Sequence, residues 1–441
     1  MKILLLHPPT KEELPPAYWS ESLGIGYLAA VLRQDGQDVE ILDAQLSGLR
    51  TQATIDALLQ REFDCLGITA THEHLPVLLA IVKAVRKQRK DAIITAGGYL
   101  PTLSSEELLR ACPGLDFIVR GEGERPAVDV FGRIKRGEDW RAAAGIAYMK
   151  DGNLVMNPMP PVVEDLDTLP FPARDALRAT DRPVWARIAG SRGCYRACSF
   201  CCSKSFYSLS GAKAPRLRSV TNIVDELEFV ISTTGKKQFR FIDDDFIGPM
   251  KQARERIPQF VEELKKRKLD ISFAIECRAD EVDEELFLQL KEVGLKEIFI
   301  GIESAVQRQL DTYNKRVTVE QNKQAIDTVR KCGIALRSGF IVFDPYVTIP
   351  EVLENVQFMQ ETGIAEESNK IVPVSFVTAV KLYPGVPLIE TLGKDGLLKR
   401  KGMEYHYTFK YPSTRVLAAI LRLSGGIRER LSSLRKPGHA K

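Results

Sequence analysis

The first 140 residues alternate short apolar runs with segments of helical spacing. The apolar runs are near-continuous and stop at Gly, Pro or charged residues, which is typical of strands buried on both faces. These expected strands cover residues 2–9, 38–44, 64–71, 91–98 and 116–124. The segments with helical spacing cover residues 25–36, 54–63, 75–89 and 104–112. Strand–helix alternation predicts an α/β fold that begins with a doubly wound, Rossmann-like parallel sheet over residues 1–140, which binds ligands beyond the carboxyl ends of its strands.

The pattern changes after residue 140. Residues 141–184 are rich in proline and acidic residues and predict a semi-extended linker. Strand–helix alternation resumes over residues 185–402 with longer units, and six strands predict a partial (β/α)6 TIM-type barrel. These strands are expected at residues 184–191, 238–245, 270–279, 297–304, 335–343 and 372–382. Residues 403–441 are expected to form a basic helical tail.

Composition sets limits on the class of protein. Hydrophobic residues make up 44% and charged residues 27% of the 441 positions, which is ordinary for a globular protein. No apolar run reaches the roughly 18 residues that a membrane span requires, and the start lacks the features of a signal peptide. We therefore expect a cytoplasmic protein without a membrane span, in which clustered cysteines bind metal more often than they form disulfides.

The net charge of +4 is unevenly distributed. Residues 415–441 carry seven Lys or Arg and one acid, a local charge of 7 − 1 = +6. Such a tail could contact RNA, a membrane surface or an acidic partner, although a solvated terminal helix is the simpler interpretation. We expect no nucleic-acid partner.

Four of the eight cysteines lie between positions 194 and 202. Cys194, Cys198 and Cys201 form a C-x3-C-x2-C group, which is incomplete for structural zinc because that site takes four ligands. Cys202 is a poor fourth ligand, since adjacent side chains of an extended chain point apart. An iron–sulfur cube held by three cysteines would keep one iron open for an outside ligand. Zinc and a ferredoxin-type cluster remain alternatives on spacing alone.

This spacing at the end of the first barrel strand, with Phe200 directly before the last cysteine, resembles the radical S-adenosylmethionine (SAM) superfamily. The resemblance implies a [4Fe–4S] cluster whose open iron chelates the amino and carboxylate groups of SAM. One electron, from an external donor of the flavodoxin or ferredoxin type, then cleaves SAM to methionine and a 5′-deoxyadenosyl radical.

Polar residues follow the later strands of the expected barrel, where parallel barrels place their sites. The resemblance implies SAM-binding roles for Phe200, Asp243, Asp244, Glu276, Arg278, Gly301, Glu303 and Ser304. The aspartates would lie near the amino group, Arg278 would pair with the carboxylate, and the segment from Gly301 would lie beside the ribose. The alternatives are a Mg²⁺ site or solvated loop for the aspartates, a structural ion pair for Arg278 and a loop cap for Glu303. Residues 381–388 resemble the late loop of the family, with Val386 in place of its usual threonine.

Residues 23–44, 96–109 and 119–126 resemble the cobalamin-binding domain of the cobalamin-dependent radical SAM class. The resemblance implies cobalamin contacts for His7, Thr69, Thr71, His72, Gly97, Gly98, Gly121 and Glu122. The D-x-H-x-x-G motif of cobalamin mutases is missing, which implies cobalamin bound without its own base or a protein histidine on cobalt. His7, His72 and His74 nevertheless follow expected strands at the cofactor edge. The alternative is a degenerate domain that binds nothing or another nucleotide.

The resemblance implies methyl transfer to an unactivated carbon of a small molecule or short peptide. The deoxyadenosyl radical would abstract a hydrogen atom, and methylcobalamin would give its methyl group to the substrate radical. A non-methylating cyclisation, ring contraction or rearrangement is the alternative within this class. A tRNA methylthiotransferase fits less well, because the first domain has only Cys65 and Cys112 to offer a second cluster.

Overall fold

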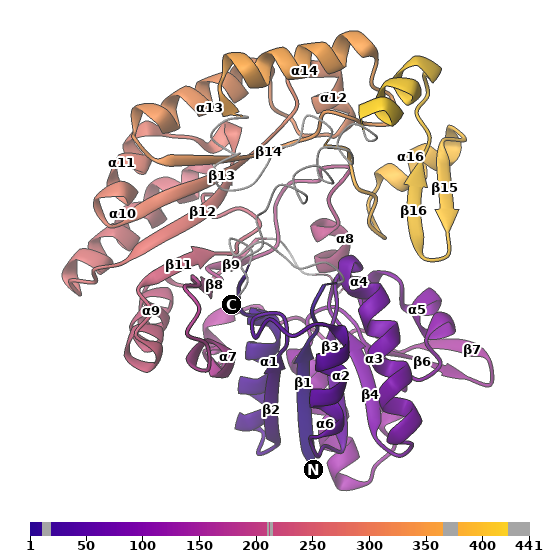
Figure 1. Ribbon diagram of the computed structural model, residues 1–441. Helices are drawn as coiled ribbons and strands as arrows, with labels where there is room; N and C mark the ends of the chain where they lie inside the picture. The colour runs from indigo at the N-terminus through magenta and orange to yellow at the C-terminus, as the bar shows by residue number, and fades with distance from the viewer. Residues whose placement is uncertain (11–18, 210, 212–214, 365–377, 422–441) are drawn as a thin grey trace, which may run out of the picture. The chain divides into compact units, whose positions relative to one another are not determined.

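A computed structural model of the protein describes residues 1–10, 19–209, 211, 215–364 and 378–421 (Figure 1). The chain divides into two compact units. The first unit comprises Met1–Arg196, Cys202–Cys277 and Asp283–Ile298. The second unit comprises Ala197–Cys201, Arg278–Val282 and the chain from Phe299 onward.

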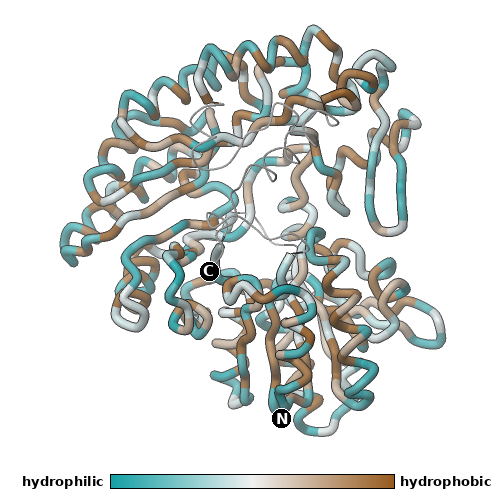
Figure 2. Tube along the Cα trace, viewed as in Figure 1, coloured by the Kyte–Doolittle hydropathy of each residue, from teal (hydrophilic) through white to brown (hydrophobic). Residues whose placement is uncertain are grey.

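The first unit contains a sheet with the strand order β2-β1-β3-β4-β5-β6-β7. Its first five strands are parallel: β1 (Lys2–His7), β2 (Asp38–Asp43), β3 (Cys65–Thr69), β4 (Ile93–Gly97) and β5 (Phe117–Val119). They coincide with the five expected strands, and Figure 2 shows that they are the most apolar part of this unit. The order reverses at β1, with β2 on one side and β3 on the other. The carboxyl ends of β1 and β3 therefore form a topological switch point, where open α/β sheets bind ligands.

Helices cover both faces of this sheet. They are α1 (Leu23–Gln34), α2 (Thr51–Leu59), α3 (Leu75–Gln88), α4 (Tyr99–Leu103), α5 (Ser105–Ala111) and α6 (Glu124–Arg136). Helix α1 packs beside α6, and α2 packs beside α3 (Figure 1). Right-handed crossovers on the two sides of β1 place these pairs on opposite faces.

The predicted linker of residues 141–184 begins too early. Strands β6 (Ile146–Lys150) and β7 (Asn153–Met156) form an antiparallel hairpin that extends the sheet past β5. Asp151 and Gly152 turn this hairpin with φ values of 51° and 79°. An Asp-Gly pair favours such a two-residue turn because both positions need positive φ, so the sequence carried the signal.

The second half of the chain forms a sheet with the order β14-β13-β12-β11-β8. Its strands are β8 (Ala186–Ile188), β11 (Gln238–Phe241), β12 (Ser272–Arg278), β13 (Leu295–Glu303) and β14 (Ala335–Phe340). The intervening helices include α9 (Val220–Thr234), α10 (Met250–Lys266), α11 (Glu284–Glu292), α13 (Val319–Lys331) and α14 (Ile349–Glu361). The expected sixth strand, 372–382, lies outside the described residues up to 377, but Ala379 makes a parallel bridge to Phe343. This is the architecture of a partial barrel.

The expected helical tail starts later than residue 403. Strands β15 (Leu398–Lys401) and β16 (Glu404–Tyr407) form a hairpin that turns at Gly402, where φ is 59°. Residues 412–421 are helical, and residues 422–441 lie outside the described part. Within the described ranges, every helix falls short of the length and apolarity that a bilayer crossing demands.

Candidate cofactor sites

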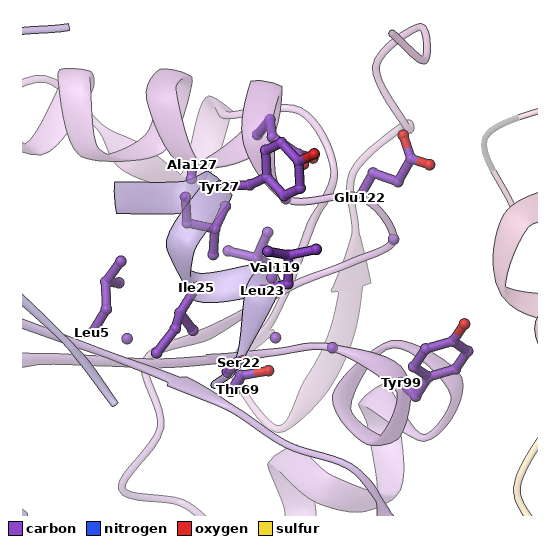
Figure 3. Close-up of a pocket in the computed structure, with 18 of the residues that line it drawn as sticks. Leu5, Ser22, Leu23, Ile25, Tyr27, Thr69, Tyr99, Val119, Glu122 and Ala127 are labelled. Atoms are coloured by element: carbon purple, nitrogen blue, oxygen red, sulfur yellow. The ribbon is translucent and has the colours of Figure 1, made fainter. Parts of the chain in front are cut away.

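A cavity of about 380 Å³ opens at the carboxyl edge of the parallel sheet, between the sheet and helices α1 and α6 (Figure 3). Leu5 and Ile25 lie toward one end, and Tyr99 and Glu122 lie toward the other (Figure 3). Most of the lining is apolar. Its polar part includes Arg187, Ser191 and Arg192, which precede the cysteine loop, and Tyr207 on the helix that follows it. Asp244, after β11, also lines the cavity. All of these residues belong to the first unit.

Small residues form the floor of this cavity. Gly67 lies within β3, Gly97 ends β4 and Gly98 follows it, and all three line the cavity. Gly98 has a φ of 95°, and a Cβ atom there would lie 3.0 Å from the Ala70 carbonyl oxygen. The local backbone therefore requires glycine at this position. A floor without side chains lets a rigid group approach the backbone closely, so the residues fit the nucleotide tail of cobalamin.

Five of the eight residues predicted to contact cobalamin line the cavity, namely Thr69, Gly97, Gly98, Gly121 and Glu122. The other three, His7, Thr71 and His72, are not among its lining residues. His7 Nδ1 lies 2.8 Å from Asp43 Oδ1 in a buried pair.

His74 belongs to the same polar cluster as His7, and their ring centroids are 5.6 Å apart. The Thr71 N–H donates to His74 Nδ1 at 3.1 Å, so Nδ1 is an acceptor and the ring is neutral. Its Nε2 can then donate to Gln45 Oε1 at 3.3 Å. Burial, with a smaller contribution from His7, lowers the pKa of His74 to about 4.

A buried ionic network forms one wall of the cavity. Arg192 Nη2 lies 2.6 Å from Glu124 Oε1, and Arg192 Nη1 lies 3.4 Å from Glu122 Oε2. Arg216 also pairs with Glu122. Burial alone would raise the pKa of Glu124, but the charge of Arg192 and its hydrogen bond lower it. The sequence analysis did not single out Arg192 or Glu124, although Glu124 lies within residues 119–126, which resemble the cobalamin-binding domain.

Two aromatic residues of this cavity also escaped sequence reasoning. Tyr99 directly follows Gly98 and stacks on Phe206, with ring centroids 4.3 Å apart and an interplanar angle of 27°. The Arg192 guanidinium lies over the ring of Tyr27, with its Cζ atom 5.0 Å from the ring centroid. Only the position of Tyr99 next to the glycine pair could have pointed to it.

The cysteine group follows β9 (Ser191–Arg192) and precedes α8 (Ser203–Ser208). Cys194, Cys198 and Cys201 are partly exposed, and no disulfide joins any of the eight cysteines, which all lie in the described ranges. Cys194 belongs to the first unit, whereas Cys198 and Cys201 belong to the second. Among the residues that the structure describes, no three His, Cys, Asp or Glu side chains are gathered closely enough to hold a metal ion.

Hydrogen-bond donors point at two of these sulfur atoms. Within the first unit, the Arg196 N–H lies 3.5 Å from Cys194 Sγ. Within the second unit, Arg278 Nη1 lies 3.8 Å from Cys198 Sγ. Such donors favour the thiolate form, which is the form that ligates iron. Three reduced cysteines, two of them with a sulfur-directed donor, fit the donor set of a [4Fe–4S] cluster.

The first unit holds three residues predicted to bind SAM. Asp243 is buried and accepts hydrogen bonds from the Gly190 N–H at 2.9 Å and Ser191 Oγ at 2.5 Å. Asp244 lines the cavity and accepts from Ser203 Oγ at 2.6 Å. Desolvation raises the pKa of both carboxyl groups. Glu276 is half-buried on β12, and its carbonyl accepts from the Phe246 N–H at 2.9 Å.

The second unit holds the others. Arg278 Nε lies 2.9 Å from Asp280 Oδ1. Such a structural ion pair was the alternative to a SAM-binding role for Arg278. Glu303 has a φ of 64° and pairs with Lys315 Nζ at 3.1 Å. A Cβ atom at Gly301 would lie 2.4 Å from Glu303 Oε1, so this glycine makes room for the pair. Sequence reasoning missed Lys315, which follows no strand.

Ser304 and Phe200 have neighbours within the second unit. Ser304 is fully buried and donates to Gln309 Oε1 at 2.6 Å. Phe200 packs edge-on against Tyr313, with ring centroids 5.4 Å apart.

Known protein families resemble both halves of this chain. A B12 binding domain family model matches residues 17–131, and a Radical SAM superfamily model matches residues 188–359. An uncharacterized methyltransferase of Pyrococcus horikoshii is 29% identical over 404 residues, which cover 90% of this chain and 84% of that protein. The anaerobic magnesium-protoporphyrin IX monomethyl ester cyclase of Rubrivivax gelatinosus is 29% identical over 361 residues, covering 78% of this chain and 62% of that protein.

A solved structure shows the same fold. The cobalamin-dependent SAM radical enzyme OxsB, with aqua-cobalamin and SAM bound, superimposes with a TM-score of 0.79 at 23% identity. The match covers 95% of this chain and 66% of that one.

Proposed function

Because the chain belongs to the cobalamin-dependent radical SAM enzymes, we propose that it transfers a methyl group to an unactivated carbon of a small molecule or short peptide. The observation that carries this proposal is the 380 Å³ cavity of the first unit. It is lined both by the B12-binding sheet and by residues that flank the cysteine loop. When bound, SAM on the cluster supplies a 5′-deoxyadenosyl radical and cobalamin supplies the methyl group.

We assign cobalamin to this cavity. The glycine floor would take its nucleotide tail, and Thr69 would contribute a hydroxyl at the end of β3. The stacked Tyr99 and Phe206 would pack against the flat ring system and exclude water. Desolvation raises the pKa of Tyr99, so its phenol stays protonated and can donate a hydrogen bond.

We assign the cluster to Cys194, Cys198 and Cys201. The donors at Arg196 and Arg278 would stabilise the thiolates. Asp244 has one oxygen held by Ser203 and faces the cavity, so it is the better candidate for the SAM amino group. Asp243 uses both carboxylate oxygens to hold the end of β8, which favours a positioning role.

The cyclase among the relatives supports a second candidate, a cyclisation or rearrangement without methyl transfer. Cleavage of SAM takes one external electron in either reaction, and methyl transfer would take a second one to reduce the corrin before it is methylated again. We propose a flavodoxin- or ferredoxin-type donor for both. The two reactions differ in their SAM products. Methylation of an unactivated carbon yields S-adenosylhomocysteine together with 5′-deoxyadenosine, whereas a rearrangement yields no S-adenosylhomocysteine.

The test starts with protein made anaerobically in cells supplied with cobalamin. About four irons and one corrin per chain are expected from the two sites. The reduced protein is then given SAM carrying a deuterated methyl group, and label in the corrin fraction and S-adenosylhomocysteine are measured by mass spectrometry. Label in the corrin supports methyl transfer. Iron without corrin, or corrin that never takes the label, would overturn it.

A further inference from the structure

Arg187 lies at the centre of β8, on the face of the strand that lines the cavity of the first unit. Its neighbours Ala186 and Ile188 are fully buried and point the other way, because successive side chains of a strand alternate between its two faces. Ile188 pairs in register with Phe241 of β11, and Phe241 packs against Phe260 of α10 with ring centroids 5.9 Å apart. Ile188 therefore faces the helices, and Arg187 faces the inner side of the partial barrel.

The same alternation continues beyond Arg187 and forms one wall of the cavity. The wall consists of alternate residues from the β8 and β11 sides, namely Arg187, Ala189, Ser191, Ile242 and Asp244. Asp244 is the candidate for the SAM amino group. Ala189 and Ile242 lie between Asp244 and Arg187 along the chain direction of the strands, and Ile242 remains 38% exposed. A molecule against this wall would therefore meet an apolar surface with a cation at its far end.

The guanidinium of Arg187 has no counter-charge in contact. Its Nε atom is fully buried without a hydrogen-bond partner, and within the described part of the chain the group forms no ion pair. Burial lowers the pKa of Arg187, as expected for a buried cation that no anion contacts. The group nevertheless keeps its proton, since arginine is not deprotonated in proteins. By contrast Arg192, the other cation among the lining residues, is paired with Glu122 and Glu124.

The carboxylates around Arg187 attract it from a distance. They are Glu21, Asp43 and Glu276. Glu21 pairs with the fully buried Arg174, and Asp43 Oδ1 lies 2.8 Å from His7 Nδ1. Glu276 is half-buried on β12. An uncompensated guanidinium in a shielded site destabilises the fold, and an anion from outside the chain would offset this cost.

We propose that Arg187 binds an oxyanion of the substrate, a carboxylate or a phosphate, so that the enzyme acts on acidic small molecules. The planar fork of donors on a guanidinium matches either group with two parallel hydrogen bonds. Held there, the oxyanion fixes one end of the substrate, and its carbon skeleton lies against Ala189 and Ile242 on the way to the SAM site. This inference rests on the proposed function, because it takes the anion to be part of the substrate of that reaction.

The experiment measures anion binding by the cofactor-loaded enzyme without turnover. Protein that carries the cluster and hydroxocobalamin is saturated with SAM, kept free of reductant, and titrated with inorganic phosphate and separately with acetate at constant ionic strength. Binding is followed by the phosphorus NMR line width of phosphate and the carbon NMR line width of labelled acetate. The parent is expected to bind at least one of the two anions. R187M is expected to bind it about tenfold more weakly or worse, since a charge-assisted bidentate contact is lost.

R254M is the matched control, because it removes the same charge from an exposed position on α10. It should bind the anion like the parent. Thermal melting separates a binding role from a structural one. R187M deletes a shielded charge that has no partner, so its melting temperature should equal or exceed that of the parent, whereas loss of a structural residue would lower it.

Three results would overturn the proposal. The first is a fully loaded parent that binds neither anion. The second is equal anion binding by the parent and R187M. The third is an R187M protein that loses affinity for hydroxocobalamin or SAM, which would assign the guanidinium to the phosphate of the corrin or to the SAM carboxylate. Failure of the proposed function is seen separately, because corrin that never takes the methyl label overturns methyl transfer and leaves the titration unaffected.

Discussion

The guanidinium of Arg192 lies 2.6 Å from the carboxylate of Glu124, and this pair joins the loop that leads to Cys194 with the first turn of α6. Both side chains are largely shielded from water, at 12% and 8% exposure. A shielded pair is costly to break from one side. Without Arg192 the Glu124 carboxylate loses its hydrogen-bonding partner, and without Glu124 the guanidinium keeps Glu122 at 3.4 Å. The pair therefore holds the approach to the cysteine loop against the wall of the cavity of about 380 Å³.

Removing either partner is expected to destabilise the protein. R192Q and E124Q should each lower the free energy of unfolding by about 2–4 kcal/mol. The double variant R192Q/E124Q should lose less than the sum, with a coupling energy of about 1–3 kcal/mol. Denaturant unfolding of the four proteins measures this coupling. Strictly additive losses would show that the pair contributes nothing as a pair.

Cys201 and Cys202 are adjacent, yet only the first is a predicted ligand. C201S should leave less than one iron per chain, whereas C202S should keep about four, since the proposed cluster ligands are Cys194, Cys198 and Cys201. Cys202 precedes α8 as its N-terminal flanking residue, where serine is well tolerated. Iron and sulfide analysis after anaerobic purification decides this. Loss of iron in C202S and retention in C201S would reassign the third ligand.

Substitution of Gly98 tests the proposal that the cavity binds cobalamin. G98A combines backbone strain of about 1 kcal/mol with a close contact at the Ala70 carbonyl. It should weaken binding of hydroxocobalamin at least about tenfold, or about 1.4 kcal/mol.

G137A is the matched control for this variant. Gly137 also has a positive φ, 71°, but a Cβ atom there would meet no atom within 4 Å. It should bind corrin like the parent, as followed by the corrin absorption spectrum. Equal binding by G98A and the parent would contradict the placement of the cofactor.

The buried His74 is expected to make the fold sensitive to acid. Its pKa falls from an ordinary 6.5 to about 4 in the folded state, so the unfolded chain binds more protons between these values. Stability is therefore complete above pH 6.5 and is lost as pH falls toward 4. Between pH 7 and 4.5 this group should remove about 2–3 kcal/mol. The free energy of unfolding of H74Q should therefore fall by about 2–3 kcal/mol less than that of the parent between pH 7 and 4.5. An equal loss in both proteins would count against a neutral buried ring.

The periodicity of the chain is enough to predict two largely parallel sheets and the alternation of strands and helices along the chain. Continuous apolar runs such as residues 3–6 have one stable environment, a strand buried on both faces. The cysteine spacing and the glycine pair at 97–98 predicted the cofactors for a related reason. Both signals are local, because an iron–sulfur cluster needs thiolate ligands and glycine allows a cofactor to approach the backbone closely. Local signals also explain the hairpin at Asp151–Gly152, which the linker prediction overlooked.

The partners of the charged and polar site residues were decided by the tertiary structure alone. Asp243 and Asp244 are neighbours in the sequence, yet one is buried holding the end of β8 and the other faces the cavity. Arg192 meets Glu124 from 68 positions away, and Lys315 meets Glu303 across the short helix α12 (Gln307–Thr312). Nothing in the sequence around either residue specifies such a partner. An ion pair forms only after folding has brought its two groups together and removed the water between them, so it follows from the packing of the sheets.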